Sequence, residues 1–244
     1  GMVRLRDFQE SSAKEIRAAL RELDKEAGGE LGGLVLDLRN NGGGLLDQAI
    51  AVANIFLAKG AIVRTRGRAG RLMDEAFATP AGTRRKLPLV VLVNKATASA
   101  SEIVAGALQD HGRALIVGER SYGKGSVQTP FRLGDGSLLK LTVALFYTPN
   151  DHMIQASGIK PDVHVGAERA IYLDSIPDLD PERADPRHLK PEDFDRPPSS
   201  ALAEDKDPTL ALAPAVRAAG EDPQMRRAVE QLLGMQRARG AKPK

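Results

Sequence analysis

The 244-residue sequence predicts an α/β domain, and three of its features point to this class. Short apolar runs at residues 33–39, 89–93 and 115–117 have the length and composition of buried strands. Segments with apolar residues at helical spacing lie between these runs, and glycines mark several of the connections. Short strands that alternate with helices are typical of an α/β fold.

The first element expected along the chain is a strand within residues 1–8, which a helix follows. Ser12 and Glu15 fit a capping box at the start of this helix. The apolar side chains of the helix recur at helical spacing, and Gly28 and Gly29 are expected to end it. The first buried strand comes next.

A second helix is expected at about residues 45–59, where Gly60 stops it, and a strand at residues 61–65 follows. Residues 66–86 are polar and rich in arginine, so no regular element is expected there. A third helix is expected between the last two buried strands, over about residues 99–110.

Residues 126–133 and 137–146 are expected to form a hairpin, because Gly134-Asp135-Gly136 has the chemistry of a tight turn. The composition changes near residue 167, beyond which ten of the 15 prolines lie among charged residues. We therefore expect one folded domain over residues 1–166 and an irregular, proline-rich extension over residues 167–244.

The extension is expected to contain one helix, near residues 222–236. Asp222 is its predicted cap, and Pro223 its first helical residue. The apolar face of this helix comprises Met225, Val229, Leu232 and Leu233. We expect this face to dock either on the domain or on a second copy of the chain. In the second case the protein would be a homo-oligomer.

The composition excludes several kinds of protein. The sequence has no cysteine, which excludes thiol chemistry, disulfides and cysteine-ligated metal sites. The net charge is +3 without a basic cluster, which argues against a nucleic-acid partner. No apolar run is long enough to span a membrane, no signal segment is visible, and the acids and histidines lack metal-ligand spacing. We therefore expect no cofactor and no metal.

Two residues in glycine- and alanine-rich surroundings suggest hydrolytic chemistry. Ser99 lies between a buried strand and a helix, and Lys124 lies between two glycines. A serine nucleophile with a lysine base is one variant of the catalytic triad. Lys124 has to be neutral to accept a proton, which requires burial to lower its ordinary pKa of about 10.4. Flanking glycines would let the backbone fold the lysine inward, and Gln128 is spaced to orient its amine.

Backbone N–H groups near the serine predict an oxyanion hole. The N–H of Ala100 lies at a helix N-terminus, where such groups have no partner within the helix. A second donor is expected from residues 40–44 (Asn-Asn-Gly-Gly-Gly), which also follow a buried strand and precede a helix. The alternatives are a tight turn for this loop, a helix cap for Ser99 and a solvated loop for Lys124. A phosphate-binding loop would need a lysine or a glycine spacing that residues 40–44 lack.

Four segments, in order, resemble motifs of the carboxyl-terminal processing proteases, also called tail-specific proteases. The segments are residues 36–44, 97–103, 118–128 and 154–163. The first is Leu-Asp-Leu-Arg-Asn-Asn-Gly-Gly-Gly, in which Gly42 stands where the family has proline. The second (Thr-Ala-Ser-Ala-Ser-Glu-Ile) resembles the nucleophile motif, and the third contains the lysine motif Gly-Lys-Gly-Ser-Val-Gln. The resemblance covers nearly all of residues 1–166.

The resemblance implies an α/β core of the Clp protease and crotonase type, and a serine endopeptidase that clips proteins near their C-termini. Ser99 would be the nucleophile, Lys124 the general base and Gln128 the orienting partner of the lysine. The implied substrates are proteins with exposed C-terminal tails, typically exported ones. A periplasmic or cell-envelope location is therefore expected for the whole bacterial protein.

The resemblance also implies that the oxyanion hole consists of the backbone N–H groups of Ala100 and of Gly43 or Gly44. The family carries a PDZ domain upstream of the core, which captures substrate tails and gates activity. We expect the full-length protein to contain this domain outside residues 1–244. A gated, inactive protease core is therefore one alternative. A second is a non-catalytic ligand carrier of the same fold, such as the interphotoreceptor retinoid-binding modules. A third is a Ser-His-Asp esterase that uses one of the four histidines.

Overall fold

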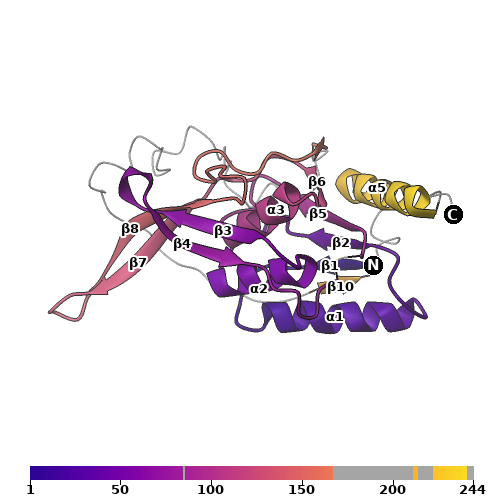
Figure 1. The fold of residues 1–244 in the computed structure, drawn as a ribbon, viewed down its shortest axis with the longest axis horizontal. Helices are drawn as coiled ribbons and strands as arrows, with labels where there is room; N and C mark the ends of the chain where they lie inside the picture. The colour runs from indigo at the N-terminus through magenta and orange to yellow at the C-terminus, as the bar shows by residue number, and fades with distance from the viewer. Residues whose placement is uncertain (85, 167–210, 214–221, 241–244) are drawn as a thin grey trace.

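The computed structural model describes residues 1–84, 86–166, 211–213 and 222–240, and these form an α/β fold (Figure 1). The helices are α1 (Ser12–Glu26), α2 (Leu46–Phe56), α3 (Ala100–Asp110) and α5 (Pro223–Gly240). The larger sheet contains, in spatial order, β10 (Ala211–Ala213), β1 (Met2–Arg4), β2 (Leu34–Asp37), β5 (Leu89–Val93), β6 (Leu115–Gly118) and β9 (Val163–His164). The smaller sheet contains, in spatial order, β4 (Leu72–Phe77), β3 (Ala61–Arg66), β8 (Leu138–Tyr147) and β7 (Ser126–Arg132).

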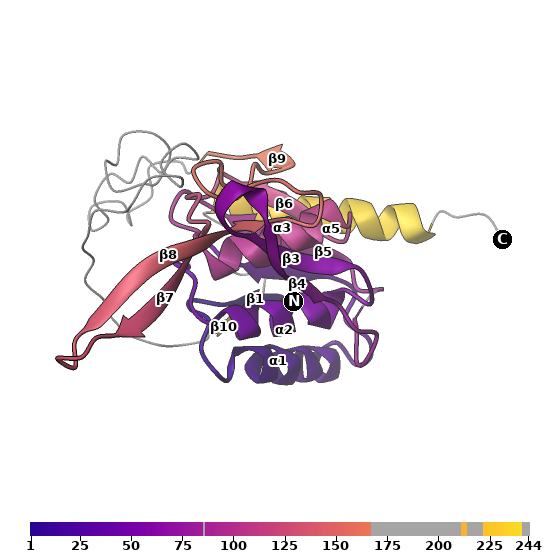
Figure 2. The same ribbon diagram turned by 60° about the vertical axis from the view of Figure 1, so that its left-hand side comes forward.

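The larger sheet is parallel from β1 to β9, and β10 pairs with β1 in the antiparallel sense. Side chains along a strand alternate between the two faces of the sheet. Leu36 and Val91 pack on one face against side chains of α1, α2 and α3, whereas Val35 and Val90 pack on the other against α5. Figures 1 and 2 show α5 and α1 on opposite sides of the sheet.

The predicted C-terminal helix is present, and it docks on the domain. Asp222 caps it as expected, since its Oδ1 accepts the N–H of Met225 at 3.0 Å. The buried apolar residues of the face that contacts the sheet are Met225, Ala228 and Leu232. Leu233, which the sequence predicted on this face, is exposed, and Val229 is only partly buried, because the helix turns Ala228 toward the sheet. A second anchor lies near the cap, where Arg39 forms an ion pair with Asp222 at 2.6 Å. Apart from β10, α5 and Asp222, the predicted irregular extension lies outside the described residues.

The smaller sheet is antiparallel, and β7 and β8 form the predicted hairpin. Its turn is closed by the N–H of Leu133, which donates to the carbonyl of Ser137 at 2.9 Å. The hairpin extends away from the rest of the described chain (Figures 1 and 2). Its outer part therefore has few neighbours, and Phe131 and Leu138 are exposed there.

Two local expectations differ from the structure. The capping box does not start at Ser12: α1 begins there, its N-cap is Ser11, and the Ser12 hydroxyl accepts the N–H of Gln9 at 2.8 Å. The arginine-rich stretch contains β4, which the sequence analysis missed. This strand lies at a sheet edge with mostly exposed side chains, so its apolar pattern is weak and its pairing with β3 defines it.

Among the described residues, no helix is both long enough and apolar enough to cross a membrane.

Candidate active site

Ser99 lies in the turn between β5 and α3 (residues 94–99, called the serine turn below), at the carboxyl end of a parallel strand. Its backbone has φ 56° and ψ −116°, which is strained for a residue other than glycine. Ala100 then begins α3, so the first N–H groups of the helix lie beside the turn. In α/β-hydrolases, the nucleophilic serine lies on a strained strand-to-helix turn, which exposes its hydroxyl.

The loop at residues 40–44, called the glycine loop below, follows β2 and lies against the serine turn. Asn94 Nδ2 donates to Asn40 Oδ1 at 2.7 Å, and Asn40 N–H donates to Asn94 Oδ1 at 3.0 Å. Ala98 N–H donates to the carbonyl of Asn41 at 2.9 Å. These three bonds join the two loops in which the sequence predicts the nucleophile and the oxyanion hole.

Gly43 touches the serine turn so closely that a side chain does not fit. A Cβ built on it would lie 2.8 Å from Ser99 Cβ and 3.0 Å from Ala100 N, and its φ is +107°. The N–H of Gly43 donates to Asn41 Oδ1 at 2.9 Å. Within the described chain, the N–H groups of Gly44 and Ala100 donate no hydrogen bond. The sequence analysis named the backbone N–H of Gly43 or Gly44 as the second donor of the oxyanion hole. Because the Gly43 N–H already donates to Asn41, the N–H of Gly44 is the one without an acceptor among the described residues.

Lys124 lies in the connection between β6 and β7 (residues 119–125, called the lysine loop below). The backbone of this loop forms hydrogen bonds with the serine turn and with the first turn of α3. Lys124 N–H donates to a side-chain oxygen of Glu102 at 2.9 Å. Tyr122 N–H donates to the carbonyl of Thr97 at 2.9 Å. The three loops therefore meet at the carboxyl ends of the neighbouring strands β2, β5 and β6.

The side chains of Lys124 and Gln128 are exposed, and neither forms a hydrogen bond or ion pair with a described residue. This differs from the expectation that flanking glycines fold the lysine inward. The glycine backbones themselves are held inside, because Gly123 N–H donates to a buried carboxylate at 2.6 Å and Gly125 N–H donates to Gln155 Oε1 at 2.9 Å. The Lys124 side chain between these two glycines extends into solvent.

Glu102, which the sequence analysis missed, lies at the centre of these contacts and is fully buried. Its Oε2 accepts the N–H groups of Ser99 at 2.7 Å and Lys124 at 2.9 Å. Its Oε1 accepts the Ser121 hydroxyl and the Gly123 N–H, both at 2.6 Å. A sequence signal was available, since Ser99 and Glu102 have the Ser-x-x-Glu spacing of a capping box.

Burial raises the pKa of Glu102 to about 7, although hydrogen bonds from Ser121, Gly123, Ser99 and Lys124 act in the opposite direction. The pKa is thus higher in the folded state than the ordinary value of 4.5 that holds in an unfolded chain. The protonated side chain favours folding below pH 4.5, and this contribution is lost as the pH rises toward 7.

We therefore predict that replacing Glu102 by glutamine removes a pH dependence of stability. Between pH 4.5 and 7, the free energy of unfolding of the wild type should fall, relative to that of Glu102→Gln, by on the order of 3 kcal/mol. Urea unfolding of both proteins across this range measures the difference. Parallel pH curves for the two proteins would contradict the prediction.

No hydrogen bond joins a described histidine to Ser99. His111 Nε2 lies 2.7 Å from the carbonyl oxygen of Ala61, and His152 lies beside Asp110. His188 is outside the described residues. Within the described part of the chain, the Ser-His-Asp alternative therefore has no histidine at the serine. The same part contains no group of three His, Asp or Glu side chains that could hold a metal ion.

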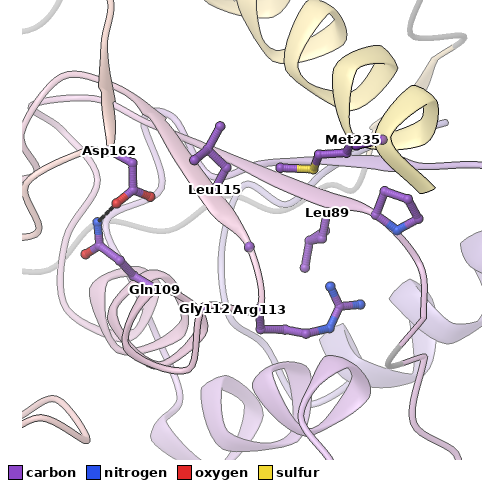
Figure 3. A pocket seen from close by; sticks show the side chains of 10 residues that line it. Leu89, Gln109, Gly112, Arg113, Leu115, Asp162 and Met235 are labelled. Atoms are coloured by element: carbon purple, nitrogen blue, oxygen red, sulfur yellow. Dashed lines mark hydrogen bonds between the residues drawn. The ribbon is translucent and has the colours of Figure 1, made fainter. Parts of the chain in front are cut away.

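A hollow of about 470 Å³ lies at the other end of β5 and β6, between α3 and α5 (Figure 3). Gln109 Nε2 donates to Asp162 Oδ1 at 2.8 Å beside it. The Arg113 side chain donates to the carbonyls of Phe56, Arg84 and Leu87. The polar groups that line this hollow are thus engaged in holding the fold, and no residue of the three loops reaches it.

The fold and the convergence of loops at the carboxyl ends of β2, β5 and β6 define an α/β protein of the Clp protease and crotonase type. The chain belongs to Peptidase family S41, whose sequence model matches residues 1–165. This confirms the resemblance that the four motifs indicated.

Similar proteins bear names of the same kind. A carboxy-terminal-processing protease of Bartonella bacilliformis is 50% identical over 166 residues, which are 68% of this chain and 38% of that protein. A carboxyl-terminal-processing protease of Synechocystis is 46% identical over 162 residues, 66% of this chain and 37% of that protein. The solved structure of a photosystem II D1 C-terminal processing protease matches with a TM-score of 0.64 and 43% identity, covering 68% of this chain and 42% of that one. The chain thus spans less than two fifths of the curated relatives' length.

Proposed function

We propose that this chain is the protease core of a serine-type, carboxyl-terminal processing peptidase with a Ser99–Lys124 dyad. The observation that carries the proposal is the strained turn of Ser99 at the start of α3, packed against Gly43. The names of the relatives support the substrate class, namely proteins cleaved near an exposed C-terminus.

In the proposed reaction, Ser99 Oγ attacks the carbonyl carbon of the scissile bond while Lys124 accepts the hydroxyl proton. The N–H groups of Ala100 and Gly44 stabilise the negative oxygen of the tetrahedral intermediate. The C–N bond then breaks, the Lys124 ammonium gives its proton to the leaving amine, and an acyl-enzyme remains. Water, deprotonated by Lys124, hydrolyses the ester and restores Ser99.

Lys124 has to be neutral for the first step, and an amine loses its charge more readily when it is removed from water. In this structure the Lys124 side chain is exposed. The proposal therefore requires that bound substrate, or a part of the whole protein beyond this chain, covers the amine. We propose that Gln128, on β7 four residues further on, then hydrogen-bonds the covered amine. The exposure of both side chains also favours the second candidate, a protease core that is inactive by itself.

The test is digestion of an unfolded protein with a small apolar C-terminus by this chain, with products identified by mass spectrometry. Fragments released near the C-terminus support the proposal. Fragments from random internal sites would support endopeptidase activity but would contradict the proposal that cleavage occurs near the C-terminus. If no fragment appears, the chain is incubated with an activated ester and Ser99 is examined for an acyl group. Acylation without digestion supports the inactive core, and the absence of both overturns the catalytic assignment.

A substitution at Gly43 tests the glycine loop. Gly43→Ala should lower kcat about 10²-fold, because the added Cβ would lie 2.8 Å from Ser99 Cβ and displace the nucleophile. Gly42→Ala is the matched control in the same loop, since a Cβ there meets no atom within 4 Å. It should leave kcat within about 2-fold of the wild type. Equal kcat values for the two variants would show that the close approach has no part in the reaction.

A further inference from the structure

The carboxylate of Glu102 is buried, which costs free energy, and the proposed reaction assigns it no role. A buried carboxylate loses its hydration and has to be compensated by hydrogen bonds or an ion pair. Among the described residues, no lysine, arginine or histidine pairs with Glu102. Its compensation consists of four donors, three of them backbone N–H groups. Such charge-assisted hydrogen bonds are shorter and stronger than neutral ones.

The distribution of these donors over the two oxygens matters. Oε2 accepts the backbone N–H of Ser99 and that of Lys124, so one atom joins the proposed nucleophile to the proposed base. Oε1 accepts Ser121 Oγ and Gly123 N–H, which belong to the lysine loop. Because Glu102 itself lies in the first turn of α3, a rigid helix holds both loops through a single carboxylate.

The carboxylate binds the backbone of Lys124 and not its amine. An ion pair between the two side chains would favour the charged ammonium and would prevent it from acting as a base. A bond to the backbone N–H fixes the lysine loop without this penalty. Glu102 thus suits a positioning role in which the distance between Ser99 and Lys124 is set and the amine stays free to change its protonation state.

We propose that Glu102 is the positioning residue of this site. Its carboxylate holds the serine turn and the lysine loop in mutual register, so that the Ser99 hydroxyl and the Lys124 amine can meet when substrate is bound. This inference rests on the proposed function for the roles of Ser99 and Lys124. The contact between the two loops, in contrast, does not depend on catalysis and can be measured separately.

The first measurement is amide hydrogen exchange, by NMR, of the wild type, Glu102→Gln, Glu102→Ala and the control Glu22→Gln, whose carboxylate lies on the exposed side of α1. The amides of Ser99, Gly123 and Lys124 should exchange at least about 10-fold faster in Glu102→Ala, since their acceptor is removed. Glu22→Gln should match the wild type. Unchanged exchange in Glu102→Ala would overturn the proposal, whether or not the chain cleaves peptides.

The second measurement is steady-state peptide cleavage by the same proteins, with the folded fraction of each determined by urea unfolding. A displaced nucleophile–base pair lowers kcat, and we expect about a 10²-fold loss in Glu102→Ala with KM changed less than about 3-fold. Glu102→Gln keeps one carbonyl oxygen, which can still accept the N–H groups of Ser99 and Lys124, so its loss should be smaller. A kcat that falls only in proportion to the folded fraction would mean a structural role alone.

Both arms remain informative if one variant fails. If Glu102→Ala does not fold, Glu102→Gln supplies the exchange rates. A glutamine keeps only one acceptor oxygen, so either the Gly123 amide or the amides of Ser99 and Lys124 lose their acceptor. Unchanged exchange at all three amides would overturn the proposal. If the wild type cleaves nothing, the proposed function fails in this chain, and the exchange rates alone decide whether Glu102 joins the two loops.

Discussion

Replacing Ser99 by alanine is expected to abolish peptide cleavage, with a loss of at least about 10³-fold in kcat. The substitution removes the oxygen that would form the acyl-enzyme, and no neighbouring group takes its place in the proposed mechanism. Ser99 is only half-buried and its side chain is small, so the loss of one oxygen should leave the fold intact. Cleavage is measured with the unfolded substrate and mass spectrometry, and folding by circular dichroism.

The matched control for this substitution is Ser137→Ala, which removes a hydroxyl from the exposed turn of the β7–β8 hairpin. It should cleave at the wild-type rate. Residual cleavage by Ser99→Ala that exceeds about one thousandth of the wild-type rate would exclude Ser99 as the nucleophile. It would direct the search to another hydroxyl or to an activated water.

Replacing Lys124 by arginine is expected to reduce kcat at least about 10³-fold, while the protein remains folded and binds substrate. The variant keeps the positive charge and most of the length, but a guanidinium is not deprotonated in proteins and cannot accept the serine proton. The side chain is exposed, so the larger head group meets no packed neighbour. The kinetic constants and the urea midpoint are compared with those of the wild type.

Lys95→Arg is the control, because Lys95 is an exposed lysine in the serine turn itself. It should retain the wild-type kcat. Full activity in Lys124→Arg would exclude Lys124 as the general base, and a different group would have to accept the serine proton. If both variants lost activity equally, the effect would belong to the charge or shape of this edge of the sheet and not to proton transfer by Lys124.

Much of the fold could be predicted because apolar patterns report burial directly. β5 has the predicted bounds, Leu89–Val93, since all five of its side chains are buried and apolar. The hairpin was predicted from its turn residues, and α5 from its cap and apolar stripe. The edge strands β4, β9 and β10 were not predicted, since they are short or exposed and their strand character depends on pairing with distant partners.

Less of the site could be predicted. The motifs predicted that the loops holding Gly43, Ser99 and Lys124 belong together, and the structure places these loops side by side. The motifs did not predict that the Lys124 side chain is exposed. The exposure of the Lys124 side chain depends on how the backbone of its two neighbouring glycines is held. Gly123 N–H donates to Glu102 and Gly125 N–H donates to Gln155, and both acceptors are far from the lysine loop in sequence.

The sequence by itself determined the family, the order of the helices and of the buried strands, and the residue types at the three loops, because these depend on local patterns and motifs. Only the tertiary structure decided how the loops are held together. The four bonds to Glu102 join residues up to 22 positions apart, and the ion pair between Arg39 and Asp222 joins residues 183 apart. Such contacts depend on the packing of distant strands and helices, which no local pattern contains.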